Sequence, residues 1–99
     1  MSKFQEIIQS KKPTLVDFYA TWCGPCQSLS TILESIKSDL KEKITILKID
    51  VDKNIKASNK FKIRSVPTLI LFQNGQIIWR INGALSKNEL KTKIETFLI

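Results

Sequence analysis

Residues 14 to 20 form a short run that is apolar on both of its alternating faces, apart from Asp17. A strand of this kind lies inside a sheet that helices cover on both sides. The run leads through a turn into residues 26 to 40, where apolar side chains recur at spacings of three and four. That spacing predicts a long amphipathic helix, so the chain is expected to be an α/β protein.

Capping signals predict a helix at each end of the chain. Ser2 and Gln5 can form a capping box for a first helix that Pro13 stops. Ser86 and Glu89 have the spacing of a second capping box, which should begin the last helix.

The middle of the chain supplies a second strand and a short helix. Residues 44 to 49 have the β-branched composition of a strand. Asp52 is then expected to cap a short basic helix that carries Ile55 and Phe61 inward.

A hairpin is expected near the end of the chain. Asn74-Gly75 is the sequence of a type I′ turn, so residues 68 to 72 and 76 to 81 should be antiparallel neighbours. The element order is then α-β-α-β-α-β-β-α, a mixed sheet with helices on both faces. With 99 residues, of which 42% are hydrophobic, residues 1 to 99 are expected to form one domain.

The residue types limit the chemistry. The chain has no histidine, which excludes Ser-His-Asp and Cys-His triads, His-ligated zinc and haem attachment through C-x-x-C-H. The glycines stand apart at positions 24, 75 and 83, so no phosphate-binding glycine loop can be drawn. Thiols, carboxylates and lysines remain.

The positive charge is concentrated in one stretch. Sixteen Lys and Arg against nine Asp and Glu give a net charge of +7, and no acidic residue lies between positions 53 and 88. This stretch is most simply a solvated face, and it could also steer acidic partners to a site. Aromatic residues are sparse between 53 and 64, so we expect no nucleic-acid partner. The basic residues of the stretch are Lys53, Lys56, Lys60, Lys62, Arg64, Arg80 and Lys87.

The sequence favours a cytoplasmic protein with no membrane partner. Residues 1 to 10 carry charges where an export signal has an apolar run of about 7 to 15 residues. No apolar run approaches the roughly 20 residues that span a bilayer. In a reducing compartment, two cysteines are more often redox-active or metal-binding than a permanent bridge.

The two cysteines lie in Trp22-Cys23-Gly24-Pro25-Cys26, between the central strand and the long helix. Residues three apart in a helix have Cα atoms roughly 5 Å apart, which suits a disulfide. So short a loop would stabilise the fold by only about 2 kcal/mol as a staple. A reversible redox pair therefore fits better than a structural bridge, and a zinc site would lack further Cys or His ligands.

The two thiols are expected to differ. Cys23 lies before the first helical turn, where free N–H groups and the helix dipole favour a thiolate, whereas Cys26 faces the apolar side of the helix. We therefore predict that Cys23 is the nucleophile and Cys26 the resolving thiol. Pro25 suits a helix start because its φ is already helical.

Three segments resemble the thioredoxin family. Residues 16 to 26 (VDFYATWCGPC) are similar to its active-site segment, and residues 66 to 68 (VPT) and 82 to 85 (NGAL) to its two substrate-facing loops. The likeness runs from about Phe4 to the C-terminus. It implies a thioredoxin-like fold in which the family's first strand is missing, so that the sheet has about four strands with residues 44 to 49 at an open edge.

The resemblance also implies roles for further residues. Asp17 would relay a proton to and from Cys26, with Lys48 nearby; the alternatives are a satisfied buried carboxylate and an edge-strand lysine. Pro67 is expected to be cis. The substrate-binding surface would comprise Trp22, Gly24, Pro25, Val66, Pro67 and Gly83.

The implied function is general protein-disulfide reduction, which donates electrons to target proteins in cell redox homeostasis. The reversible Cys23–Cys26 disulfide would be reduced again by a flavoprotein thioredoxin reductase, with no metal and no bound cofactor, in a monomer. Two rivals remain. One is a disulfide oxidase or isomerase, which Gly24-Pro25 disfavours, and the other is a binding module without catalysis.

Overall fold

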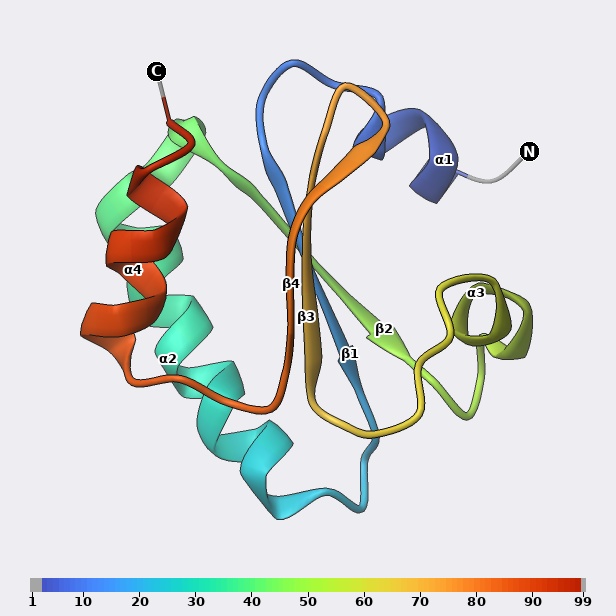
Figure 1. Cartoon of the computed structure of the whole chain (residues 1–99). Coiled ribbons are helices and arrows are strands. Elements are labelled where there is room, and N and C mark those ends of the chain that lie inside the picture. The colour runs from blue at the N-terminus through green and yellow to red at the C-terminus, as the bar shows by residue number, and fades with distance from the viewer. Residues whose placement is uncertain (1–2, 99) are drawn as a thin grey trace.

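The computed structural model describes residues 3–98 and has a four-stranded mixed sheet (Figure 1). The central apolar run forms β1, which is one of the two inner strands of this sheet. The strand order is β2-β1-β3-β4, with β1 parallel to β2 and antiparallel to β3, and β3 antiparallel to β4. The predicted mixed sheet and the open edge at β2 are thus confirmed for the described residues. The strands are β1 (Thr14–Tyr19), β2 (Thr45–Asp50), β3 (Thr68–Gln73) and β4 (Gln76–Asn82).

Helices cover both faces of the sheet, as predicted. In Figure 1, α2 and α4 lie on one side of the sheet and α1 and α3 on the other. The order along the chain matches the expected one, with a short 3-10 helix after α2 that the sequence did not predict. The helices are α1 (Lys3–Ile8), α2 (Gly24–Leu40), η1 (Lys41–Lys43), α3 (Ile55–Lys60) and α4 (Lys87–Glu95).

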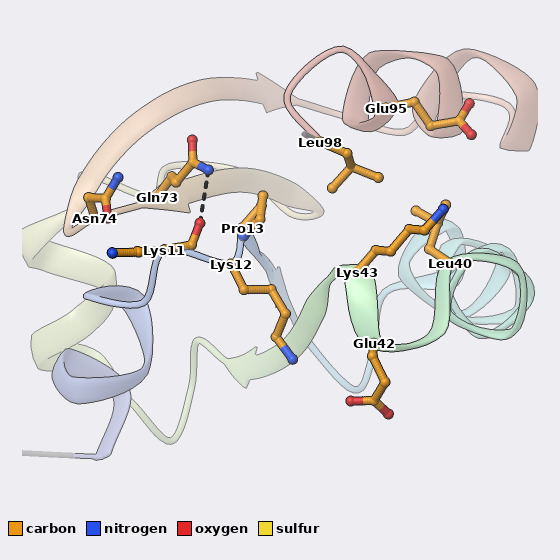
Figure 2. A pocket seen from close by; sticks show the side chains of 10 residues that line it. All are labelled: Lys11, Lys12, Pro13, Leu40, Glu42, Lys43, Gln73, Asn74, Glu95 and Leu98. Atoms are coloured by element: carbon orange, nitrogen blue, oxygen red, sulfur yellow. Dashed lines mark hydrogen bonds between the residues drawn. The ribbon is translucent and has the colours of Figure 1, made fainter.

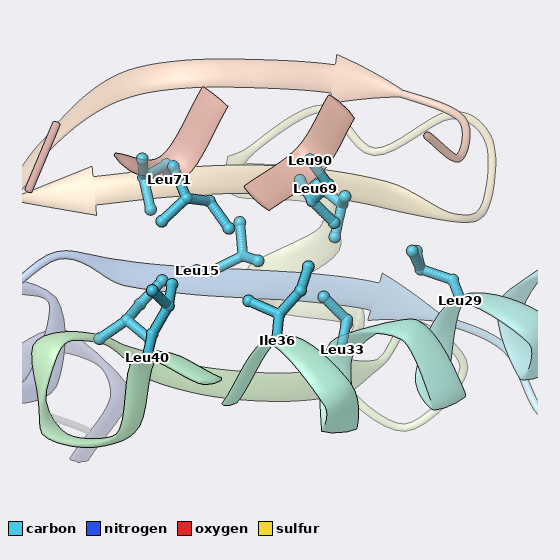
Figure 3. Close-up of a cluster of buried hydrophobic side chains, with 10 residues drawn as sticks. Leu15, Leu29, Leu33, Ile36, Leu40, Leu69, Leu71 and Leu90 are labelled. Atoms are coloured by element: carbon cyan, nitrogen blue, oxygen red, sulfur yellow. The ribbon is translucent and has the colours of Figure 1, made fainter. Parts of the chain in front are cut away.

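The larger core cluster lies between the sheet and the α2/α4 layer. Apolar residues of α2 at spacings of three and four point at the same face of the sheet (Figure 3). Complete burial of a Leu or Ile side chain contributes about 2 kcal/mol, so this cluster supplies much of the stability. Its buried members are Leu15, Leu29, Leu33, Ile36, Leu40, Ile44, Leu69, Leu71, Leu90 and Ile94.

The opposite face of the sheet packs mainly through aromatic rings. Phe4 of α1 and Phe61, just after α3, contact each other edge to face at 5.8 Å between ring centroids. Both also meet Phe72 of β3, at 5.9 and 5.3 Å. The two short helices of this layer are therefore anchored by rings.

The structure corrects two predictions about α3. The N-cap residue is Asn54, not Asp52, and its side chain makes no capping hydrogen bond. Ile55 is 63% exposed, not inward, because it is the first residue of a six-residue helix whose inward positions are Ala57 and Ser58. Phe61 does pack inward as predicted.

The turns and caps largely follow the sequence. Asn74 and Gly75 have φ values of 54° and 79°, the positive pair that a type I′ turn requires. The capping box of Ser86 and Glu89 is confirmed, whereas that proposed for Ser2 lies outside the described residues. The first helix ends at Ile8, well before the expected stop.

Candidate active site

Cys23 occupies the N-cap of α2, directly after the turn that leaves β1. Its backbone is extended, with φ −92° and ψ 112°, and its Sγ accepts a hydrogen bond of 3.2 Å from the backbone N–H of Cys26. A sulfur in this position satisfies one of the free N–H groups of the helix and lies at the positive end of the helix dipole. The geometry therefore favours a thiolate over a thiol at Cys23 whenever this sulfur is reduced.

Cys23 and Cys26 are joined by a disulfide, with their Cα atoms 5.3 Å apart. Cys23 is 5% exposed and Cys26 2% exposed, and both pack against Ala20 with Tyr19 and Val66 around them. The predicted spacing is therefore present, and Cys26 lies on the apolar side of the helix as expected.

Asp17 is a fully buried carboxylate in the centre of the sheet. It shares a face of β1 with Leu15, which packs under α2, so Asp17 points toward the helix that holds Cys26. No residue between 3 and 98 donates a hydrogen bond to either of its oxygens. Burial raises the pKa of Asp17 from 3.8 to about 6, although the charge of Lys48 opposes part of this rise.

Lys48 is the cross-strand neighbour of Asp17 in the register of β1 and β2. Its ammonium does not form an ion pair with the carboxylate within residues 3–98. Instead, Nζ donates a 2.7 Å hydrogen bond to Ser30 Oγ and lies 4.6 Å from the centroid of the Tyr19 ring. A pocket of about 340 Å³ extends from Lys48 and Ser30 to Cys26, so this side of the Cys26 sulfur is open to small molecules.

Trp22 is 72% exposed and turns toward the loop after β2. Its indole Nε1–H donates a 3.0 Å hydrogen bond to Asp52 Oδ2. Asp52, which the sequence assigned to a helix cap, thus holds the exposed indole beside the cysteines. No local pattern predicts this partner because 30 residues separate the pair.

The loop before β3 lies against the disulfide. The Val66-Pro67 peptide bond is cis, as the resemblance implied. The carbonyl oxygen of Val66 is 3.8 Å from Cys23 Sγ, and Gly83 donates a 2.8 Å hydrogen bond from its N–H to the Pro67 carbonyl.

Gly83 has φ 127°, a conformation that favours glycine, and a Cβ at either Gly83 or Gly24 would meet nothing within 4 Å. The surface around the cysteines is therefore low and open, as is suitable for docking an extended chain. The structure brings together all the residues that the resemblance placed in the substrate-binding surface, with Pro25 in the first turn of α2.

Two polar side chains hold this loop, Arg80 of β4 and Thr68 of β3, and no local sequence pattern assigns either of them this role. The guanidinium of Arg80 donates hydrogen bonds to the carbonyl oxygens of Phe61 and Lys62, and Nε donates to Asn82 Oδ1 at 3.4 Å. Thr68 Oγ1 donates to the Ser65 carbonyl at 2.7 Å. Arg80 was counted only as part of the positive stretch, because its partners become visible only once β4 lies beside the loop.

A second pocket, of about 760 Å³, lies at the opposite end of the sheet (Figure 2). It is lined near the start of β1 by Lys11 and Pro13, and near the chain's C-terminal end by Glu95 and Leu98. Charges of both signs surround it, and no cysteine lines it. The candidate chemistry therefore lies at the other end of β1.

The fold and the site define the class of dithiol/disulfide redox domains, and comparisons with known proteins identify the family. A sequence model described as Thioredoxin matches residues 1–96. The chain is 46% identical over 98 residues to "Thioredoxin Y, chloroplastic" of Oryza sativa subsp. japonica, covering 98% of this chain and 58% of that protein. It is 47% identical over 89 residues to the "Bifunctional thioredoxin reductase/thioredoxin" of Mycobacterium leprae (strain TN), covering 90% of this chain and 19% of that protein.

A solved structure of a mutant thioredoxin from Halobacterium salinarum NRC-1 has a TM-score of 0.90 at 32% identity. That match covers 100% of this chain and 86% of the other. The chain belongs to the thioredoxin family. It spans 58% of the rice protein and 19% of the bifunctional mycobacterial one. No helix in the described part of the chain has the length and apolar character needed to cross a membrane.

Proposed function

We propose that this chain is a general protein-disulfide reductase that donates two electrons to target disulfides through Cys23 and Cys26. The observation that carries the proposal is the position of Cys23 Sγ at the N-cap of α2, where it accepts the N–H of Cys26 at 3.2 Å. After reduction of the disulfide, the same N–H group and the helix dipole stabilise a Cys23 thiolate.

In the first step, the Cys23 thiolate attacks one sulfur of the substrate disulfide. A mixed disulfide forms between Cys23 and the substrate, and the other substrate sulfur leaves as a thiolate that takes a proton. The low surface around Gly24, Val66 and Gly83 supports this step because it leaves room for a protein substrate. The backbone of Val66 can pair with an extended substrate segment, which is a short form of strand addition.

In the second step, Cys26 attacks Cys23 Sγ, and the second substrate thiol is released. Cys26 must lose its proton for this attack, and Asp17 is the base that we assign to it, with the proton passing through water. A carboxyl whose pKa is about 6 is partly protonated near neutral pH and can both accept and return a proton. The pocket beside Lys48 and Ser30 reaches Cys26, so water can approach that sulfur from this side.

The oxidised protein then needs a dithiol donor, and we assign this role to a thioredoxin reductase. The fusion of both activities in the name of the mycobacterial relative supports the pairing. We propose a monomer in the cytoplasm, because a reducing compartment keeps a reversible dithiol pair such as Cys23 and Cys26 in use rather than locked as a permanent bridge. A chloroplastic relative at 46% identity makes a plastid the alternative compartment.

The test compares the wild-type protein with Cys23→Ser and Cys26→Ser in single-turnover reduction of a protein disulfide. Cys23→Ser should abolish reduction, because no nucleophile remains at the helix start. Cys26→Ser should form the mixed disulfide and stop there, which mass spectrometry detects as a covalent adduct.

Equal rates in all three proteins would contradict the thiol mechanism. An equilibrium with glutathione distinguishes reductase from oxidase: a reductase potential lies near or below that of cytosolic glutathione, roughly −220 to −320 mV. A potential of about −120 mV, typical of a strong oxidant, would favour the oxidase alternative.

A further inference from the structure

A groove of about 430 Å³ lies between α1 and α3, on the side of the sheet away from α2. We call it the α3 groove and define it by a floor of Phe4, Ile49 and Phe61 and a rim of Lys53, Lys56 and Lys60. The floor rings contact each other and Phe72 in the core, as described above. The groove is therefore preformed, because closing it would require repacking the aromatic cluster.

Ile55 lies at the mouth of this groove. It is 63% exposed, although the sequence of the short basic helix predicts that it points inward. A single exposed apolar side chain is ordinary on a protein surface. Beside an apolar groove, however, it enlarges the apolar area that a partner can bury.

The charges on the rim lack partners. Within residues 3–98, none of Lys53, Lys56 and Lys60 forms an ion pair; the ion pairs there are those of Asp39 with Lys87 and Lys91. Lys60 Nζ lies 5.6 Å from the centroid of the Phe61 ring, so one rim charge stands over the floor. The groove thus combines an apolar floor with uncompensated positive charge, and it is complementary to an acidic segment that carries an apolar side chain.

The rim of the groove begins next along the chain to the residue that holds the Trp22 indole. Asp52 accepts the hydrogen bond from Trp22 Nε1, and Lys53 is the next residue along the chain. A substrate that is bound at the cysteines and passes the indole would therefore come next to Lys53 on the rim of the groove.

We propose that the α3 groove is a second binding site for protein substrates, which holds an acidic segment with an apolar anchor while the substrate disulfide lies at Cys23. This inference rests on the proposed reductase function. The occupant is a protein and not a nucleic acid, because the rings of Phe4 and Phe61 are half-buried edge to face and offer no surface for base stacking.

The experiment uses the reduced full chain and a cyclic two-cysteine peptide as the disulfide substrate. The peptide is prepared alone and with one of three tails, joined by a flexible Gly/Ser linker of about 12 residues that reaches on the order of 20 Å. The first tail is a helix of Glu with a stripe of Leu, the second replaces Glu by Lys, and the third replaces Leu by Ser. The second-order rate constant of reduction is measured by single turnover.

The Glu/Leu tail should raise the rate constant about tenfold, and each of the other two tails should remove most of the gain. Ile55→Ser should cut the gain severalfold at both low and high salt, because an apolar contact is not screened. The triple variant Lys53→Gln, Lys56→Gln and Lys60→Gln should abolish it at low salt.

The matched control is the triple variant Lys41→Gln, Lys43→Gln and Lys93→Gln, which lowers the net charge equally at exposed positions away from the groove. It should retain most of the gain, and an equal loss would overturn the proposal in favour of long-range steering. Binding of a 15-residue oligothymidine in the groove, together with no gain in the rate constant from the Glu/Leu tail, would also overturn the proposal.

Reduction of the peptide without a tail separates the two proposals. If that reaction proceeds in every variant and the tail gives no gain, the α3 groove is not a binding site and the reductase function stands. If the tailless peptide is not reduced even by the wild-type protein, the proposed function itself fails.

Discussion

The two helical layers of this molecule differ in how their helices begin and in what they cover. In one layer, α2 has 17 residues and α4 has nine, and both start at a side-chain cap. In the other, α1 and α3 have six residues each, and α3 starts without a capping hydrogen bond from its N-cap side chain. Aliphatic packing fills the first interface, and aromatic rings fill the second.

This difference matches the tasks of the two layers. The cap of α2 is the sulfur of Cys23, so the residue that starts the helix is also the nucleophile that we propose. A long, well-packed helix holds that sulfur in one position, as nucleophilic attack requires. In the other layer, the described residues leave an apolar groove and lysines without ion pairs at the surface, which suits recognition. If this contrast is correct, the α2/α4 layer should carry most of the stability, and exposed residues of the α1/α3 layer should carry little of it.

The largest effect is expected from truncation in the α2 layer. Ile36 is completely buried, so Ile36→Ala should lower the free energy of unfolding by about 2 to 5 kcal/mol. Ile55→Ala, in the α3 layer, should change it by no more than about 0.5 kcal/mol. Urea denaturation of both variants measures the difference. A large loss in the free energy of unfolding of Ile55→Ala would show that Ile55 stabilises the fold and is not a free surface for a partner.

Asp17 should make stability depend on pH. Its pKa is raised from 3.8 to about 6 in the folded protein, so the unfolded chain loses this proton first as the pH rises. The fold therefore loses stability between about pH 4 and pH 6, and the loss reaches about 3 kcal/mol above that range. Asp17→Asn cannot ionise and should lack this decline.

Urea denaturation of the oxidised wild type and of Asp17→Asn, at pH 4 and at pH 8, provides the measurement. The variant should be the more stable protein at pH 8 and should lose that advantage at pH 4. An advantage of the same size at both values would show that packing, and not ionisation of the carboxyl, causes it.

The smallest effect compares the two kinds of helix start. Ser86 accepts the Glu89 N–H in a complete capping box, so Ser86→Ala should cost about 1 kcal/mol in the free energy of unfolding. Asn54→Ala should cost much less, because the Asn54 side chain does not cap α3. Its amide does donate a 2.9 Å hydrogen bond to the Asp50 carbonyl, whose loss sets the residual cost.

Thermal unfolding monitored by circular dichroism resolves a difference of this size in a chain of 99 residues. If both alanine variants lose the same stability, the contrast between capped and uncapped helices is wrong.

Local patterns were sufficient for much of the fold. The type I′ turn at Asn74-Gly75 and the capping box at Ser86 depend on neighbouring residues alone, and both appear as predicted. The predictions for α3 are wrong: the helix begins after Asn54 and not after Asp52, and Ile55 points to the surface and not inward. A helix of six residues offers too few turns for its apolar spacing to define an inward face.

The site divides in the same manner. Cys23, Cys26 and the start of α2 follow from a five-residue motif between a strand and a helix. The partners that complete the site come from distant parts of the chain: Asp52 for the Trp22 indole, Ser30 for the Lys48 ammonium and Arg80 for the loop before β3. Hydrogen bonds across such separations leave no periodic signal in a single sequence.

The amino-acid sequence by itself determined the class of the fold and the redox pair, because helix periodicity, turn residues and cysteine spacing act over a few residues. Only the tertiary structure decided which charges stay unpaired, which carboxyl is buried without a hydrogen bond, and where the α3 groove opens. These properties depend on what the rest of the chain places beside a residue, and burial and charge pairing act through space rather than along the backbone.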